Sequence, residues 1–189
     1  MYHHHLIPRR DIMNRLFYPR LALSNIIKHR KTYIPYLLSS TIIIALFYTI
    51  TALRFNKDLI AKSQDGEIMI ETLKYSVYLV AIFSCIFILY TNTFLTKRRR
   101  KEIGLYNILG MEKKHIMHML LFENIYTIII SIIGGLVFGF IFGKILFLLL
   151  LKITSFIDQN IQFPISMQAI YLTILIFTPL FLVTLLSNI

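Results

Sequence analysis

The residues of this chain that could take part in binding are concentrated in one stretch, TKRRRKEIGLYNILGMEKKHI, at positions 96–116. The stretch begins with five consecutive basic residues, Lys97–Lys101. A helix through the next residues would place apolar and aromatic side chains at three-to-four spacing and end at a glycine. These residues are Ile103, Leu105, Tyr106, Leu109 and Gly110. The basic run alone would anchor a loop at a membrane, but that role does not account for Glu102, Gly104 or Tyr106.

No residue pattern in the chain is typical of a catalytic, cofactor or metal site. The sequence has no nucleophile elbow and no cysteine pair, since its one cysteine, Cys85, lies in an apolar run. The run FGFIFGK ends in Gly143 and Lys144, but it lacks the first glycine and the Ser or Thr of a phosphate-binding loop. We therefore expect this chain not to be an enzyme.

Three glycines, Gly135, Gly139 and Gly143, recur at every fourth residue and so share one face of a helix. Small residues at this spacing let two helices approach closely, so we expect helix packing, with the partner in this chain or in a second copy. Lys144 lies near one end of the same apolar run, where it would reach the lipid headgroups or contact an anionic ligand. Glu123, near the other end, would need a basic partner from the nearby Lys and Arg cluster.

The composition indicates a membrane protein, since 57% of the 189 residues are hydrophobic and the mean hydropathy is +0.69. Four apolar runs could cross about 30 Å of hydrocarbon as helices, which takes roughly 20 residues each. They are Tyr33–Leu53, Tyr75–Leu95, Tyr126–Leu151 and Ser166–Leu186. None alternates in polarity as a barrel strand does. The first three begin at a tyrosine, which suits anchoring at the headgroup boundary. The sequence therefore predicts an all-α integral membrane protein with about four spans.

The distribution of Lys and Arg predicts the orientation of these spans. Residues 1–32 and 96–119 each carry seven basic residues, whereas 54–74 balances four basic residues with four acids, and 152–165 has one of each. Because basic loops stay on the cytoplasmic side, the N-terminus and the segment 96–116 are expected there. The formal charge of +11 would also suit a nucleic-acid binder. The basic residues lie directly beside apolar runs, however, so we expect no nucleic-acid partner.

The chain divides into three predicted parts. Residues 1–12 have no periodicity and precede a second methionine, Met13, so we interpret them as an extension or an expression scar. Residues 13–32 are predicted to form an amphipathic helix on the inner membrane surface. A basic, disordered segment is the alternative there. Residues 33–189 would form the four-helix transmembrane domain.

One family shares these features. KRRRKEIGLYNILGMEKKHI, followed by LLFENIY and GGLVFGFIFGK, resembles the signature region of the FtsX-like permeases of ATP-binding-cassette (ABC) transporters. The short loop between the first two spans is most similar to the members associated with resistance to bacitracin and other antimicrobial peptides. The resemblance covers nearly the whole chain from about Met13. It implies that 96–116 holds a cytoplasmic coupling helix that contacts a separate ATPase through Glu102, Ile103, Leu105, Tyr106, Leu109 and Gly110.

The resemblance also implies a function, that of a multi-pass permease subunit in the bacterial cell membrane. ATP and Mg²⁺ would be bound by the partner ATPase, with no cofactor in this chain. Other implied partners are membrane lipids, a peptide antibiotic or its lipid-linked target, and a sensor histidine kinase. Permeases of this type are expected to have further spans and a large external domain, so the chain looks like an N-terminal half. Two alternatives remain, a regulator acting on a sensor kinase or a cell-wall enzyme, and a small self-associating bundle.

Overall fold

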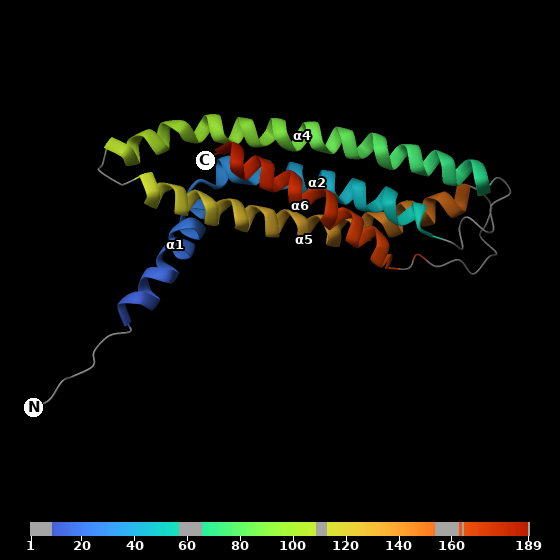
Figure 1. The fold of residues 1–189 in the computed structure, drawn as a ribbon. Helices are drawn as coiled ribbons and strands as arrows, with labels where there is room; N and C mark the ends of the chain where they lie inside the picture. Colours follow the sequence, from blue (N-terminus) through green and yellow to red (C-terminus); the bar gives the residue numbers. More distant parts are fainter. Residues whose placement is uncertain (1–8, 57–65, 109–112, 154–162, 164, 189) are drawn as a thin grey trace, which may run out of the picture.

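The computed structural model describes residues 9–56, 66–108, 113–153, 163 and 165–188. Every regular element among these residues is an α-helix, and Figure 1 shows their arrangement. The helices are α1 (Arg9–Lys28), α2 (Arg30–Arg54), α4 (Gly66–Ile108), α5 (Lys113–Ile153) and α6 (Met167–Asn188). The predicted all-α fold is thus confirmed.

Four of these helices, α2, α4, α5 and α6, are long and apolar enough to cross a membrane, in agreement with the four predicted spans. Two of them extend well beyond the predicted limits. The 43 residues of α4 and the 41 of α5 would measure roughly 65 and 62 Å at 1.5 Å per residue, about twice the hydrocarbon thickness. Neither helix contains a proline that would interrupt the helical backbone past the apolar runs.

The sequence predicted a coupling helix between the second and third spans. Residues 97–108 are helical and continue α4 without a break, and α5 begins at Lys113. The expected end of this helix near Gly110 falls in residues 109–112, which lie outside the described part of the chain.

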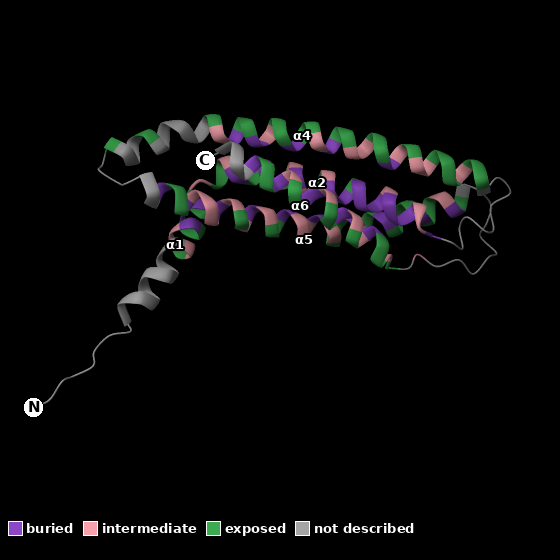
Figure 2. Ribbon diagram, in the orientation of Figure 1, coloured by how far each residue is buried: buried purple, intermediate pink, exposed green. Residues whose placement is uncertain are grey.

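Helix α2 is the centre of the bundle. It packs against α1, α4, α5 and α6, and 56% of its apolar window is buried, against 17% for α4 and 22% for α5. The burial colouring in Figure 2 shows this difference, with purple residues gathered on α2 and green residues along the outer side of α4. The other spans therefore surround α2 on several sides and turn broad faces outward.

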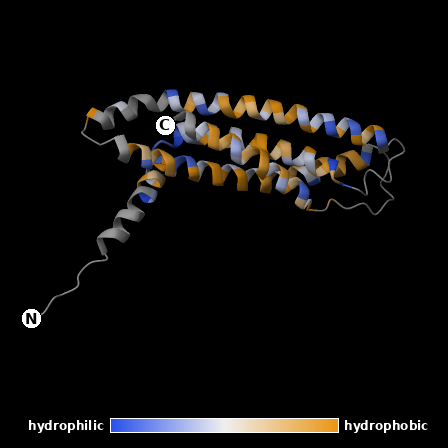
Figure 3. Cartoon of the chain, viewed as in Figure 1, coloured by the Kyte–Doolittle hydropathy of each residue, from blue (hydrophilic) through white to orange (hydrophobic). Residues whose placement is uncertain are grey.

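The outward faces are apolar. Exposed side chains along α4 include Leu79, Ile82 and Phe83, and α5 exposes Ile133 and Phe138 in the same way. Figure 3 shows the apolar colour running along the outside of these helices, away from the chain's polar ends. An apolar surface of this size is unfavourable in water and suits contact with lipid tails. A helix can lie in lipid because its backbone hydrogen bonds are made within the helix.

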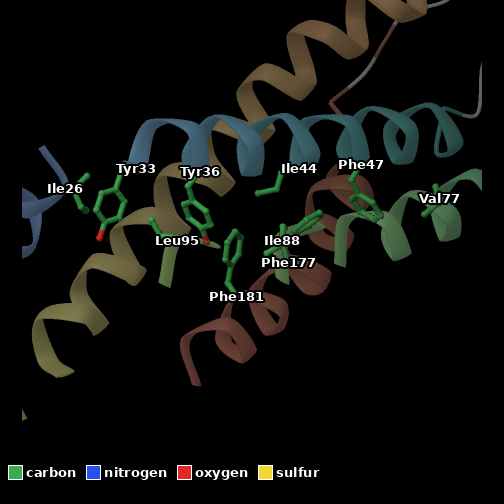
Figure 4. Packing of buried hydrophobic residues seen from close by; sticks show 10 residues of the cluster. All are labelled: Ile26, Tyr33, Tyr36, Ile44, Phe47, Val77, Ile88, Leu95, Phe177 and Phe181. Atoms are coloured by element: carbon green, nitrogen blue, oxygen red, sulfur yellow. The ribbon is translucent and has the colours of Figure 1, made fainter. Parts of the chain in front are cut away.

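Aromatic side chains fill the centre of the bundle (Figure 4). Phe47 of α2 meets Phe177 of α6 edge to face, with ring centroids 5.4 Å apart. Tyr33 lies in the same core at 2% exposure, so its prediction as an interfacial anchor is wrong. Tyr75, by contrast, is 65% exposed and remains suited to an interface.

The N-terminal helix α1 leaves the bundle at an angle (Figure 1). It begins at Arg9, four residues before the predicted start, so part of the presumed extension is helical. Near its end, α1 packs mainly against α5 and buries Ala22, Asn25 and Ile26. Ile27 stays 62% exposed on the other side. One face of α1 therefore packs against the bundle. The location of α1 on the inner membrane surface stays a prediction.

Candidate functional site

The first candidate site is the end of α4 that carries the predicted coupling residues. Lys97 and Ile108 are exposed, the latter to 84%, and a Cβ atom built on Gly104 would meet no other atom within 4 Å. Steps of seven and four residues keep these three positions on one face of the helix. An open face therefore runs along the end of α4 beyond the apolar run.

The predicted contact residues lie on or just beyond this segment. The backbone of Glu102, Ile103, Leu105 and Tyr106 belongs to α4, while their side chains are outside the described set. Leu109 and Gly110 fall outside the described residues altogether. In Figure 1 the end of α4 and the start of α5 project together past the ends of α2 and α6. The contact roles of these residues stay predictions.

A second candidate site is a buried polar cluster around Glu123 of α5. Its carboxylate is 1% exposed, and two helices donate hydrogen bonds to it. The side-chain amide of Asn25, in α1, donates to Oε1 at 2.8 Å, and the hydroxyl of Tyr33, in α2, donates to Oε2 at 2.9 Å. Both donors are themselves buried, at 6% and 2% exposure. One carboxylate thereby links three helices at a place that water does not reach.

The hydrogen bonds of this cluster hold the three helices together. A buried polar group costs free energy unless it is hydrogen-bonded, and here both oxygens of Glu123 accept a bond. The sequence predicted a Lys or Arg partner for Glu123, whereas these two donors are an amide and a phenol. The basic partner stays a prediction, and the roles of Asn25 and Tyr33 were missed. Asn25 carried a signal, because it is the one amide in the stretch Leu21–Ile27, where Ser24 is the only other polar residue.

The third feature is the glycine face of α5, which packs against α2 of the same chain. A Cβ atom on Gly139 would lie 2.9 Å from the carbonyl oxygen of Ala45, and one on Gly135 would lie 2.5 Å from Cβ of Ile44. The glycine face for which helix packing was predicted therefore lies against a helix of this same chain. The α2–α5 seam, meaning this contact between the two helices, also contains a hydrogen bond from the Thr49 hydroxyl to the carbonyl oxygen of Gly139 at 3.0 Å.

The pairs along this seam show the direction of the two helices. The residue numbers of the contacting pairs increase in the same direction along both helices, so α2 runs parallel to α5. The pairs are Tyr33 with Glu123, Ile44 with Gly135 and Thr49 with Gly139. Two segments that cross a membrane in the same direction must be separated by one that returns. Helix α4 supplies that return, as the alternating orientation predicted from the basic loops requires.

The far end of the seam is closed by Phe163. A Cβ atom on Gly143 would lie 2.9 Å from Cζ of Phe163, whose ring is 5.4 Å from that of Phe147 and 6.0 Å from that of Phe140. Lys144, next to this glycine, is exposed on the other side of α5. Its predicted contact with lipid or a ligand stays a prediction. Within the described part of the chain, no group of three His, Cys, Asp or Glu side chains could hold a metal ion.

Comparison with known proteins defines the class to which this arrangement belongs. Residues 75–189 match the family model described as FtsX-like permease C-terminal, which is more than half of the chain. The matched region includes the projecting end of α4, Glu123 and the glycine face. The chain therefore belongs to the FtsX-like permease family, as its sequence resemblance predicted.

Individual relatives cover most of this chain. It is 32% identical over 171 residues to the bacitracin export permease protein BceB of Bacillus subtilis, and 30% identical over 168 residues to BceB of Halalkalibacterium halodurans. It is also 28% identical over 162 residues to the uncharacterized ABC transporter permease YvcS of Bacillus subtilis. These matches cover 85–89% of this chain but only 25–26% of each relative. The chain thus spans about a quarter of the relatives' length, less than the half that was expected.

Proposed function

We propose that this chain is part of the membrane-spanning permease of an ABC transporter for resistance to peptide antibiotics. The names of two relatives, both bacitracin export permeases, support this assignment. Because the chain spans about a quarter of their length, the transport activity is a property of the whole permease. ATP, with Mg²⁺, would be bound and hydrolysed by a separate subunit, and this chain would contribute no catalytic group.

The observation that carries the proposal is the projecting, partly apolar end of α4. Ile108 lies 13 residues beyond Leu95, the last residue of the predicted span, which is about 20 Å along the helix. A large aliphatic side chain that is 84% exposed outside the lipid suits a protein partner. The basic residues between these two positions fix the boundary of the membrane. The segment beyond them would dock in a cleft of the ATPase.

The remaining partners follow from this assignment. The end of the bundle with Arg30 and Lys97 would face the cytoplasm, where the ATPase and ATP are found. A peptide antibiotic or its lipid-linked target would be handled by the complete permease, and Lys144, at the opposite end, is the candidate contact for an anionic group or a lipid. A sensor histidine kinase is the further partner expected for resistance. Co-purification of such a kinase supports this role, whereas co-purification of a cell-wall hydrolase would favour the regulatory alternative.

The test uses substitutions in the docking segment of the full-length permease. Tyr106→Ala and Leu109→Asp should leave membrane insertion intact and weaken ATPase association, because buried aromatic and aliphatic anchors contribute a few kcal/mol to an interface. Affinity for the ATPase should fall at least about tenfold, which corresponds to 1.4 kcal/mol. Peptide resistance should fall in parallel.

Lys113→Ala is the control, since this residue is the first of α5 and lies outside the predicted docking residues. It should change ATPase binding and resistance little. Full ATPase binding by both docking variants, at normal abundance in the membrane, would exclude this segment as the coupling site and favour the small self-associating bundle.

A further inference from the structure

Helix α1 is joined to the rest of the molecule at two places. The first is the bend at His29, between Lys28 and Arg30, where φ is −98° and ψ is 29°. Backbone hydrogen bonds cross this bend, from His29 N–H to the carbonyl oxygen of Asn25 and from Tyr33 N–H to that of His29. The second place is the side-chain bond from Asn25 to Glu123. The angle of α1 to the bundle is thus set by a backbone bend together with a bond to α5.

Glu123 is well placed to pass movement along α5. It lies ten residues after Lys113, the first residue of α5, or about 15 Å along the helix axis. The helix is unbroken between these residues and continues to Ile153. A displacement of the start of α5 therefore reaches Glu123 through a single rigid element.

The type of contact at Glu123 matters for such transmission. Apolar side chains can slide past one another in lipid at little cost, because lipid tails are as apolar as their packing partners. A carboxylate held by two directional hydrogen bonds cannot slide, since any shift leaves buried donors and acceptors unsatisfied. Tyr33 ties one oxygen of Glu123 to α2, and the other oxygen is directed at Asn25. A turn of α5 about the bond to Tyr33 would therefore be transferred to Asn25 and α1.

We propose, on the basis of the permease function given above, that Glu123 is a positioning residue through which the start of α5, which follows the proposed docking segment in the chain, sets the angle of α1. During the ATPase cycle α1 follows α5 and bends at His29 relative to α2. Asn25 receives the movement, and Tyr33 holds the carboxylate in the orientation that reaches Asn25. The amphipathic arm formed by α1 is thereby a moving part of the permease.

The test measures the α1–α2 distance in the full-length permease with its ATPase, in lipid nanodiscs. Spin labels are placed on cysteines at Arg20 in α1 and Leu38 in α2, both exposed, in a background without other cysteines. Pulsed electron resonance then compares the nucleotide-free state with the state trapped by ATP and vanadate. The unsubstituted protein should show a nucleotide-dependent change in this distance. Asn25→Leu should abolish the change while ATPase association and abundance stay the same, and the unfolding temperature should fall because a hydrogen bond to a buried carboxylate is lost.

Two further variants control the experiment. Ser24→Ala, an exposed neighbour of Asn25 on α1, should keep the full distance change. Glu123→Gln keeps the side-chain shape and one acceptor oxygen, so it should insert normally and show a reduced change even if Asn25→Leu folds poorly. Peptide resistance should fall in Asn25→Leu and Glu123→Gln and persist in Ser24→Ala.

The outcomes separate this inference from the proposed function. If Asn25→Leu and Glu123→Gln keep the full distance change, or if the unsubstituted complex hydrolyses ATP without any change, Glu123 does not transmit movement to α1 and the permease assignment stands. If no ATPase associates with the unsubstituted permease, the proposed function fails and this inference fails with it.

Discussion

The hydroxyl oxygen of Thr49 lies 3.0 Å from the carbonyl oxygen of Gly139 and 2.8 Å from that of Ala45. Its single proton is therefore shared between α5 and its own helix. The backbone of α5 comes within reach because Gly139 has no Cβ atom to keep the helices apart. The α2–α5 seam thus combines close backbone packing with a hydrogen bond, the two interactions that hold helices together where both lipid and protein are apolar.

Gly139→Leu should disrupt this seam. Even the Cβ atom would lie 2.9 Å from the carbonyl oxygen of Ala45 and from Cδ1 of Tyr48, and a backbone oxygen moves only if the whole helix shifts. Overpacking typically costs about 1–3 kcal/mol, and this site has little room to relax. The folded yield in detergent and the unfolding temperature should both fall. Ile141→Leu, at a residue that is 49% exposed, is the control, and equal behaviour of the two variants would mean that the glycine spacing is incidental.

Thr49→Val should have a smaller effect, because it keeps the shape of the side chain and removes only its hydroxyl. Hydrogen bonds between helices in membranes contribute about 0.6 kcal/mol on average and up to about 1.7. Thr51→Val is the matched control, since the Thr51 hydroxyl donates to Phe47 within the same helix. The difference between the two free energies of unfolding, measured in detergent, isolates the bond to α5. If Thr51→Val costs as much as Thr49→Val, the bond across the seam contributes nothing.

Phe163→Ala should loosen the end of the bundle beside Gly143. The substitution removes ring contacts with Phe140 and Phe147 and uncovers the end of the seam. Loss of a fully buried Phe side chain typically costs about 3–5 kcal/mol, and Phe163 is only partly buried, so the cost should lie below that range and appear as a lower unfolding temperature. Tyr171→Ala, at a residue that is 66% exposed, should cost much less. The reverse order would show that Phe163 does not secure this end.

The predicted orientation can be tested by labelling single cysteines on intact cells in a background without Cys85. Cysteines at Gln64 and Gln159, which lie outside the described residues, should react with a reagent that cannot cross the membrane. One at Asn107, on the projecting end of α4, should be protected until the cells are opened. Labelling of Asn107 together with protection of Gln64 would invert the topology and place the basic segment outside.

Much of the fold could be predicted from the sequence, because long apolar runs have few alternatives to membrane-spanning helices. The glycine face could also be predicted, since its four-residue spacing identifies the surface along which helices pack. The central position of α2 could not. Its hydropathy is close to that of α4, although 56% of its window is buried against 17% in α4. Apolar side chains suit lipid and protein interiors equally well, so hydropathy does not distinguish them.

The candidate site was less accessible to sequence reasoning. Glu123 was recognised as an acid that needs a partner, but its donors come from positions 98 and 90 residues away, and no local pattern connects them. Tyr33 has the side chain expected of an interfacial anchor, and only the packing of α5 shows that its hydroxyl is occupied. The docking segment was predicted because it carries apolar residues that membrane anchoring does not require, and its role stays a prediction.

The parallel pairing of α2 and α5 has a consequence for how the protein is made. Both Tyr33–Glu123 and Thr49–Gly139 join residues 90 positions apart, so at 5–20 residues per second the second helix is synthesised roughly 5–18 s after the first. During that interval α2 enters the membrane without the glycine face against which it will pack. The Thr49 hydroxyl can donate to Ala45 of its own helix in the meantime. The Thr49 hydroxyl of a newly made α2 is therefore hydrogen-bonded in lipid before α5 is present. Once α5 packs against α2, the same hydroxyl also donates to the carbonyl oxygen of Gly139.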